Sequence, residues 1–230
     1  MPDLSIAIQH TPTRADRRMW VQAMTEQLRS ENPNIPVTVV EDTRLEGCWP
    51  TYRRALEAAG NVSHHLVLQD DLALCRDFIG AVEEVIRARP NHLISLYTNA
   101  ESVYTARARG EAWVEKAGAS GPSIIWPGEL IGEFLQWQDK HINRNFEWDT
   151  VRVSMWLIKT SKRAFATVPS LTQHLGSESS LLGLNGSHKV AAWFIGEQQS
   201  ALGIDWSQGL ASPPKETTLI HPEWWAHFQE

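Results

Sequence analysis

The chain has few cysteines and lacks any long apolar run. Its two cysteines, Cys48 and Cys75, show neither the spacing of metal ligands nor a disulfide framework, so ordinary thiols in a reducing cytoplasm are expected. No apolar stretch is long enough to span a bilayer. The apolar segment at 4–8 begins without a basic region or a small-residue cleavage site. These absences predict a cytoplasmic protein without a secretory signal or membrane insertion.

An excess of basic residues is also missing. The chain has 21 Lys and Arg against 27 Asp and Glu, a formal net charge of -6. Non-specific binding to nucleic acid depends on many Lys and Arg contacts with phosphates. The composition therefore argues against a dominant nucleic-acid surface, although it leaves room for a local basic groove.

Tryptophan, in contrast, is abundant, with 11 residues in 230. The flat indole face and single N–H donor suit stacking on sugars or bases. Several tryptophans stand beside polar residues rather than within apolar runs: Trp49, Trp113, Trp137, Trp148, Trp206, Trp224 and Trp225. Ordinary packing at a core or an edge is the alternative for each of them.

The first hundred residues alternate strand-like and helix-like segments. Strand-like runs at 4–8, 37–40, 66–68 and 93–96 are separated by amphipathic segments with helical spacing. This order predicts parallel strands with helices on both faces of a sheet. With 230 residues, 42% of them hydrophobic, and no linker rich in Pro, Gly or Ser, we expect a single α/β domain over 1–230.

The second half is less regular. Residues 101–119 show no clean period, which predicts a long loop. A strand is expected at 123–126, and Pro127 suits the first position of a helix reaching about residue 140. A polar loop at 143–149 precedes a further helix over about 150–159.

Paired carboxylates end the third predicted strand. Residues 64–71 read HHLVLQDD, an apolar run that stops at Asp70 and Asp71. Open α/β sheets bind ligands at the carboxyl edge of their strands. Two adjacent carboxylates there need an offsetting positive charge, for which a divalent metal bridging phosphate oxygens is a candidate. The alternative is an acidic turn that caps the next helix.

Two later positions offer complementary chemistry. Asp149 precedes the helix predicted from Thr150 and could act as a general base, with Glu147 as the second candidate. Asp149 could equally cap that helix, and the two roles are compatible. His174 could ligate a metal through neutral imidazole, or it could be a structural histidine.

In this order along the chain, Asp70, Asp71, Asp149 and His174 resemble the acidic motif, base and histidine of GT-A-fold glycosyltransferases. The resemblance covers roughly 4–180. It implies a GT-A-like, Rossmann-type, mostly parallel sheet flanked by helices, with an irregular C-terminal acceptor region. It also implies that residues 1–100 bind a nucleotide sugar, with UDP the favoured carrier, and that 101–230 bind the acceptor.

The resemblance further implies a hexosyltransferase of the inverting type that uses Mn²⁺ or Mg²⁺. Asp71 and His174 would be metal ligands, and Asp149 or Glu147 the catalytic base. The motif departs from the family in carrying Gln69 where many relatives have an acid, which leaves open how the ribose is held. Donor contacts are expected from the first turn after a strand and from four later positions: Gln9, His10, Thr11, Arg14, Asp42, Arg53, Gln69 and Asp70.

Polar residues are favoured in turns whatever their function, which is the alternative for the turn positions among these. Three serines near His174 could bind phosphate or cap a short helix: Ser177, Ser179 and Ser180.

The acceptor is less defined by the sequence. Small stand-alone chains of this kind resemble bacteriophage glycosyltransferases, some of which modify hydroxymethylated bases in DNA, within the host cytoplasm. Six basic residues could line such an acceptor groove: Arg107, Arg109, Arg144, Lys159, Lys162 and Arg163. Glycan, lipid-linked and protein acceptors stay open.

Two other classes of function compete. A nucleotidyltransferase would use a related sheet and metal, but no Gly-rich basic phosphate loop follows the first strand. A non-catalytic carbohydrate-binding module would explain the tryptophans, but such modules are usually β-sandwiches, whereas this chain alternates strands and helices.

Overall fold

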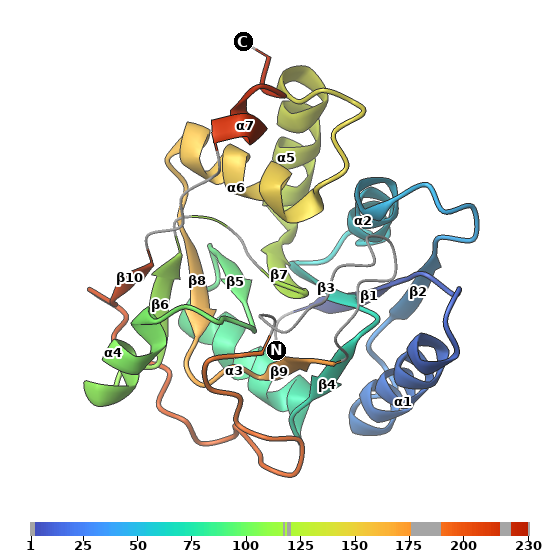
Figure 1. Ribbon diagram of the computed structural model, residues 1–230. Helices are drawn as coiled ribbons and strands as arrows, with labels where there is room; N and C mark the ends of the chain where they lie inside the picture. Colours follow the sequence, from blue (N-terminus) through green and yellow to red (C-terminus); the bar gives the residue numbers. More distant parts are fainter. Residues whose placement is uncertain (1–2, 117, 119–120, 176–189, 217–221, 230) are drawn as a thin grey trace.

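An eight-stranded sheet with helices on both faces forms the centre of the molecule (Figure 1). The computed structural model describes residues 3–116, 118, 121–175, 190–216 and 222–229. The sheet order is β2-β1-β3-β7-β5-β8-β6-β10. Its strands are β1 (Leu4–His10), β2 (Val37–Glu41), β3 (His64–Gln69), β5 (Leu93–Ser95), β6 (Trp113–Lys116), β7 (Ser123–Pro127), β8 (Ala164–Thr167) and β10 (Lys215–Glu216). The helices are α1 (Ala15–Glu31), α2 (Cys48–Glu57), α3 (Phe78–Ala88), α4 (Ser102–Ala108), α5 (Gly128–His141), α6 (Asp149–Thr160) and α7 (Pro222–Trp225).

The predicted α/β fold class is confirmed. β1 pairs in parallel with both β2 and β3, and β5 pairs in parallel with β8. β7 runs antiparallel between β3 and β5. Successive residues of β1 face opposite sides of the sheet, as a strand requires: Ile6 and Ile8 join the core that holds α1 and α3, whereas Ala7 joins the core that holds α2, α5 and α6.

The prediction of a long loop over 101–119 is wrong. The segment contains α4 and β6, and β6 pairs antiparallel with β8. Trp113 in β6 is fully buried and donates its indole N–H to the Trp206 carbonyl at 2.8 Å. These elements, of seven and four residues, are too short to show a period, and contacts with distant segments fix them.

A small second sheet extends the chain beyond the end of β3. β4 (Leu72–Leu74) pairs antiparallel with β9 (Thr172–His174), and Leu72 lies opposite His174. The Leu175 N–H also donates to the Asp71 carbonyl at 2.6 Å. This pairing brings His174 beside Asp71, although a hundred residues separate them in sequence.

A buried histidine makes the stability of the folded state depend on pH. His65 in β3 has no exposed surface, and its ring nitrogens contact the Ala55 carbonyl (2.9 Å) and the Ser5 hydroxyl (2.8 Å). Burial lowers the pKa of His65 from 6.5 to about 4, so the folded state keeps the ring neutral where the unfolded chain binds a proton. Stability therefore falls as pH drops through this window, by up to about 3 kcal/mol.

We expect this loss in urea unfolding curves measured from pH 7 to pH 4. Because carboxylates also titrate in this range, the comparison is with His65→Gln, which should show a shallower dependence. Identical slopes for the two proteins would contradict the assignment.

Candidate functional site

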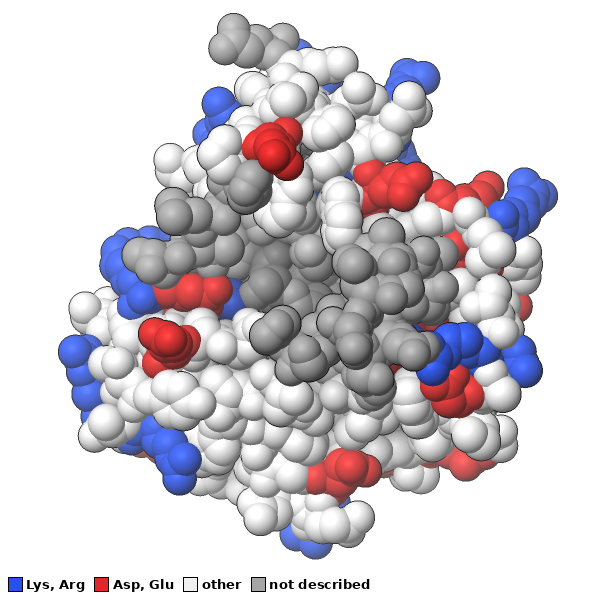
Figure 2. Space-filling model, in the orientation of Figure 1, with Lys and Arg blue, Asp and Glu red and all other residues white. Residues whose placement is uncertain are grey.

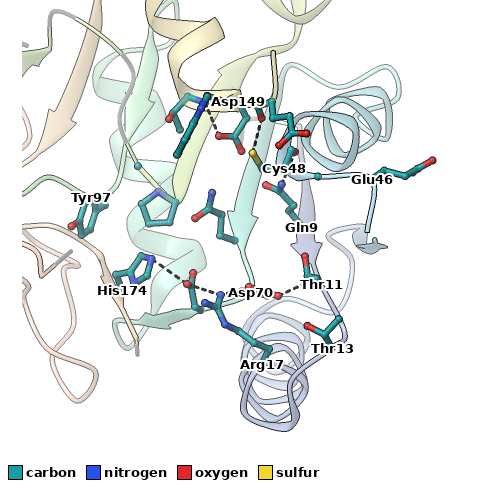
Figure 3. Close-up of a pocket in the computed structure, with 18 of the residues that line it drawn as sticks. Gln9, Thr11, Thr13, Arg17, Glu46, Cys48, Asp70, Tyr97, Asp149 and His174 are labelled. Atoms are coloured by element: carbon teal, nitrogen blue, oxygen red, sulfur yellow. Dashed lines mark hydrogen bonds and ion pairs between the residues drawn. The ribbon is translucent and has the colours of Figure 1, made fainter. Parts of the chain in front are cut away.

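A cavity of about 900 Å³ opens at the carboxyl ends of β1 and β3 (Figure 3). Segments far apart in sequence line it: the ends of these two strands, the turn before α2, the turn before β7, and the start of α6. Asp70, Asp71, Asp149 and His174 all line this one cavity. The sheet edge at the end of the HHLVLQDD segment thus borders a cavity. The acidic and imidazole groups that the sequence singled out line that cavity together.

Asp70 ties the end of β3 to the turn after β1. Its carboxylate accepts the Thr11 backbone N–H at 2.9 Å, and it lies 2.9 Å from His10 Nδ1 and 2.5 Å from Arg17 Nη1. The parallel register places Gln9 opposite Gln69, so the residues that follow the two strands meet. Asp70 is only 5% exposed, and these contacts hold its carboxylate in one position.

The Asp71 carboxylate lines the cavity and contacts both an arginine and a histidine. Its Oδ2 lies 2.5 Å from Arg17 Nη1 and 3.1 Å from His174 Nε2. The same Arg17 nitrogen therefore lies between the two neighbouring carboxylates, and Arg17 is itself buried. Part of the positive charge that this pair requires is supplied by the protein.

The sequence analysis missed Arg17. It singled out Arg14, which instead pairs with Asp16 at 2.6 Å and is not among the residues that line the cavity. Arg17 lies in the first turn of α1, the helix that directly follows β1. An arginine at this place, one helical turn after Arg14, is the signal that could have identified it.

The donor atoms of Asp71 and His174 fit two ligands of one divalent ion. Neighbouring ligands of an octahedral ion with bonds of about 2.1 Å are about 3 Å apart, and Asp71 Oδ2 and His174 Nε2 are 3.1 Å apart. Among the described residues, no group of three or more His, Cys, Asp or Glu is placed to hold a metal. A bound ion would need phosphate oxygens or water as further ligands, and it would compete with Arg17 for Asp71.

Asp149 is both the first residue of α6 and a wall of the cavity. Its Oδ1 accepts the Thr150 N–H at 2.6 Å, as an acidic residue at a helix N-terminus does. Glu147 and Trp148 line the cavity beside it, and both are exposed. Asp149 is thus the first residue of the helix and not its N-cap, which is Trp148, and its position on the cavity wall is compatible with a role toward a ligand.

The pKa of the Cys48 thiol depends on the burial and charges of this wall of the cavity. Its thiol donates to the Glu147 carbonyl at 2.6 Å. Burial, with the nearby Asp149 carboxylate, raises the pKa of Cys48 to about 12. Because only the thiolate reacts, we expect iodoacetamide at pH 8 to alkylate Cys48 at least about 100-fold more slowly than an ordinary free thiol.

Peptide-resolved mass spectrometry would measure this rate, with urea-unfolded protein as the reference. Asp149→Asn should accelerate the reaction, because it removes a negative charge that disfavours the thiolate. Labelling of the folded protein as fast as of the unfolded chain would contradict this account of the wall.

The structure places the other predicted donor contacts in four different ways. Gln9, Thr11 and Gln69 line the cavity, and Gln9 donates to the Cys48 carbonyl at 2.9 Å. His10 is buried against Asp70 rather than in the lining. Asp42 is 1% exposed and accepts the backbone N–H groups of residues 46 and 47, so it shapes the turn before α2.

Arg53 is not brought to this cavity. It pairs with Asp139 and lines a second, smaller cavity. Three predicted phosphate-binding serines lie outside the described residues: Ser177, Ser179 and Ser180.

The six basic residues considered for an acceptor groove do not line the cavity. Lys162 pairs with Glu133, and Arg163 pairs with Glu115. On the face shown in Figure 2, the described Lys and Arg side chains form separate patches rather than a stripe. Among the tryptophans singled out, Trp49, Trp113 and Trp206 are buried in packing, whereas Trp148 is 39% exposed at the cavity.

Comparisons with known proteins give fold-level similarity only. Neither a protein-family model nor a curated protein sequence matches the chain. A mutant β-1,4-galactosyltransferase 7 from Drosophila, in complex with manganese, UDP-Gal and xylobiose, is 7% identical, with a TM-score of 0.46 over 88% of this chain and 77% of that chain. CMP:2-keto-3-deoxy-manno-octonic acid synthetase complexed with CTP is 8% identical, with a TM-score of 0.39 over 71% of this chain and 88% of that chain. Similarity at this level identifies neither a family nor an activity.

The structure also bears on membrane association. Among the helices of the described residues, none combines the length and the apolar character needed to cross a bilayer.

Proposed function

We propose that this protein is a glycosyltransferase that moves a sugar from a nucleotide diphosphate sugar, with UDP as the carrier, to an acceptor hydroxyl. One observation carries the proposal: the cavity at the carboxyl edge gathers two kinds of group that such a transfer needs. Figure 3 shows Arg17 and His174 on one side and Asp149 on the other, with Gln9 between them. The first side suits a departing diphosphate, and the second suits a hydroxyl that must lose its proton.

On the diphosphate side, Asp71 and His174 would hold Mn²⁺ or Mg²⁺. When bound, the ion would offset the negative charge that develops on the leaving group. Arg17 now contacts Asp71. If a cation bound Asp71 instead, the Arg17 N–H groups would be able to donate to phosphate oxygens. Asp70 keeps the guanidinium and the Thr11 backbone in place through its three contacts.

On the nucleotide side, Gln9 offers an acceptor. Its Oε1 is buried and has no hydrogen-bond partner among the described residues, while its amide nitrogen is held by the Cys48 carbonyl. A buried acceptor of this kind is costly unless a ligand satisfies it. We assign it, with Thr11 and Gln69, to the base or ribose of the donor, within a donor-binding half formed by residues 1–100.

On the acceptor side, Asp149 would take the proton of the attacking hydroxyl, with Glu147 as the second candidate. The Thr150 N–H fixes one oxygen of Asp149, which orients the carboxylate. A positioned base of this kind contributes about 10²–10⁴-fold. Attack opposite the departing diphosphate gives inversion at the sugar, and residues 101–230 would supply the acceptor-binding half.

A screen of nucleotide sugars with Mn²⁺ tests the proposal, with released nucleoside diphosphate as the readout. Release of UDP from one UDP-sugar, lost with chelator, is the expected result. Release of pyrophosphate from a nucleoside triphosphate would instead establish a nucleotidyltransferase. Sugar binding without turnover, unchanged in Asp71→Ala, would establish a binding module.

The acceptor needs its own experiment. Transfer to DNA that contains hydroxymethylcytosine is compared with transfer to plain DNA, with free sugars and glycans as parallel acceptors. Equal background incorporation into both DNAs would remove DNA modification from consideration.

A further inference from the structure

A second cavity, of about 370 Å³, shares no lining residue with the larger one. Residues of α2, α5, α6 and the segment between the last two line it. Its charged lining consists of three arginines and one carboxylate: Arg53, Arg144, Arg152 and Asp139. The proposed sugar transfer uses none of these four residues.

Arg152 is a buried cation without a carboxylate partner among the described residues. The side chain has no exposed surface. Its N–H groups donate to the carbonyls of Asn143 and Phe146 at 2.9 Å and to Gln138 Oε1 at 2.8 Å, and its guanidinium lies 4.5 Å from the Trp49 ring centroid. These groups are neutral, and burial lowers the pKa of Arg152 to about 10. The Asp139 and Asp149 carboxylates act on Arg152 electrostatically without a hydrogen bond to it, so the buried charge stays costly and an anion would offset part of that cost.

The one carboxylate of the cavity is already neutralised. Asp139 accepts two hydrogen bonds from Arg53, at 2.5 and 2.9 Å, and a third from the Gln138 amide. Arg144 is exposed at the cavity, and no carboxylate among the described residues pairs with it. Three guanidinium groups therefore share one small cavity with a single carboxylate, which leaves an excess of two positive charges.

We infer that this cavity binds an oxyanion, either a free phosphate or sulfate ion or the phosphate group of a small molecule. Guanidinium groups bind such oxyanions through paired, charge-assisted N–H donors. Arg144 would contact the anion from the open side, and Arg152, which has no exposed surface, would attract it through its charge, while Arg53 offsets the charge of Asp139. The inference is independent of the reaction proposed for the larger cavity.

Calorimetric titration of the full chain with inorganic phosphate tests the inference, with sulfate as a second probe and sodium chloride at matched ionic strength as the blank. Wild-type protein should bind phosphate or sulfate above the blank. Arg144→Gln should weaken that binding at least about tenfold, because it removes one charged donor. Arg109→Gln is the matched control, since Arg109 is also exposed but lines neither cavity, and it should bind as the wild type does.

Glucose 6-phosphate, with glucose as its control, distinguishes the two sources of the anion. Tighter binding than inorganic phosphate would assign a phosphorylated small molecule, and equal or weaker binding would assign the free ion. Three results would overturn the inference: no binding above the chloride blank, wild-type affinity in Arg144→Gln, or an equal loss in Arg109→Gln.

Discussion

Asp71→Asn should lower sugar transfer by about 10²–10³-fold, the size of effect seen when one stabiliser of developing negative charge is removed. The substitution keeps the shape of the side chain but removes the charge that faces both Arg17 and His174. A metal held between Asp71 and the donor diphosphate would be lost with it. The measurement is kcat/KM for the UDP-sugar found in the screen, together with UDP affinity in Mn²⁺ and in chelator.

The pattern of donor binding is as informative as the rate. UDP affinity should fall in Asp71→Asn when Mn²⁺ is present and stay unchanged in chelator. Asp77→Asn is a suitable control, because Asp77 lies outside both cavities and its left-handed backbone, at φ 55°, tolerates asparagine. Wild-type turnover by Asp71→Asn in chelator would rule out the role assigned to Asp71.

Asp149→Asn should abolish most transfer, by about 10²–10⁴-fold, while leaving donor affinity close to wild type. A base acts on the proton only as the hydroxyl attacks, so its loss lowers kcat without weakening the ground-state complex. Asparagine can still accept the Thr150 N–H, so the start of α6 should be retained. Single-turnover transfer and UDP titration, on the same protein, measure the two quantities.

Glu147→Gln is the matched variant for this experiment. Glu147 is exposed at the same cavity, two residues before Asp149. If Asp149 is the base, Glu147→Gln should keep most of the activity; the reverse result would exchange the two roles. A large loss of donor binding in Asp149→Asn would instead mean that this residue is structural.

The parts of the fold that could be predicted are those with a strong local period. β1 and β3 are apolar runs, and α5 and α6 have amphipathic spacing after recognisable starts, so each was expected close to its observed bounds. The meeting of Asp70 with the turn after β1 follows from neighbouring parallel strands whose carboxyl ends share an edge.

The parts that could not be predicted depend on contacts between distant segments. β4 and β9 have three residues each, and the position of His174 beside Asp71 depends on their register. Arg17 is ordinary in its helix and becomes part of the site only because α1 packs against β4, the strand that begins directly after Asp71. Arg53 was expected to contact the nucleotide-sugar donor, but it pairs with Asp139, which lies 86 residues later in the sequence.

The most direct test is the position of Mn²⁺ in crystals grown with UDP and Mn²⁺, located by anomalous scattering. We predict one peak bonded to both the carboxylate of Asp71 and the imidazole of His174, with the diphosphate as a further ligand and Arg17 turned toward phosphate. A diphosphate bound elsewhere, with Arg17 still bridging the two aspartates and no manganese near them, would contradict the account.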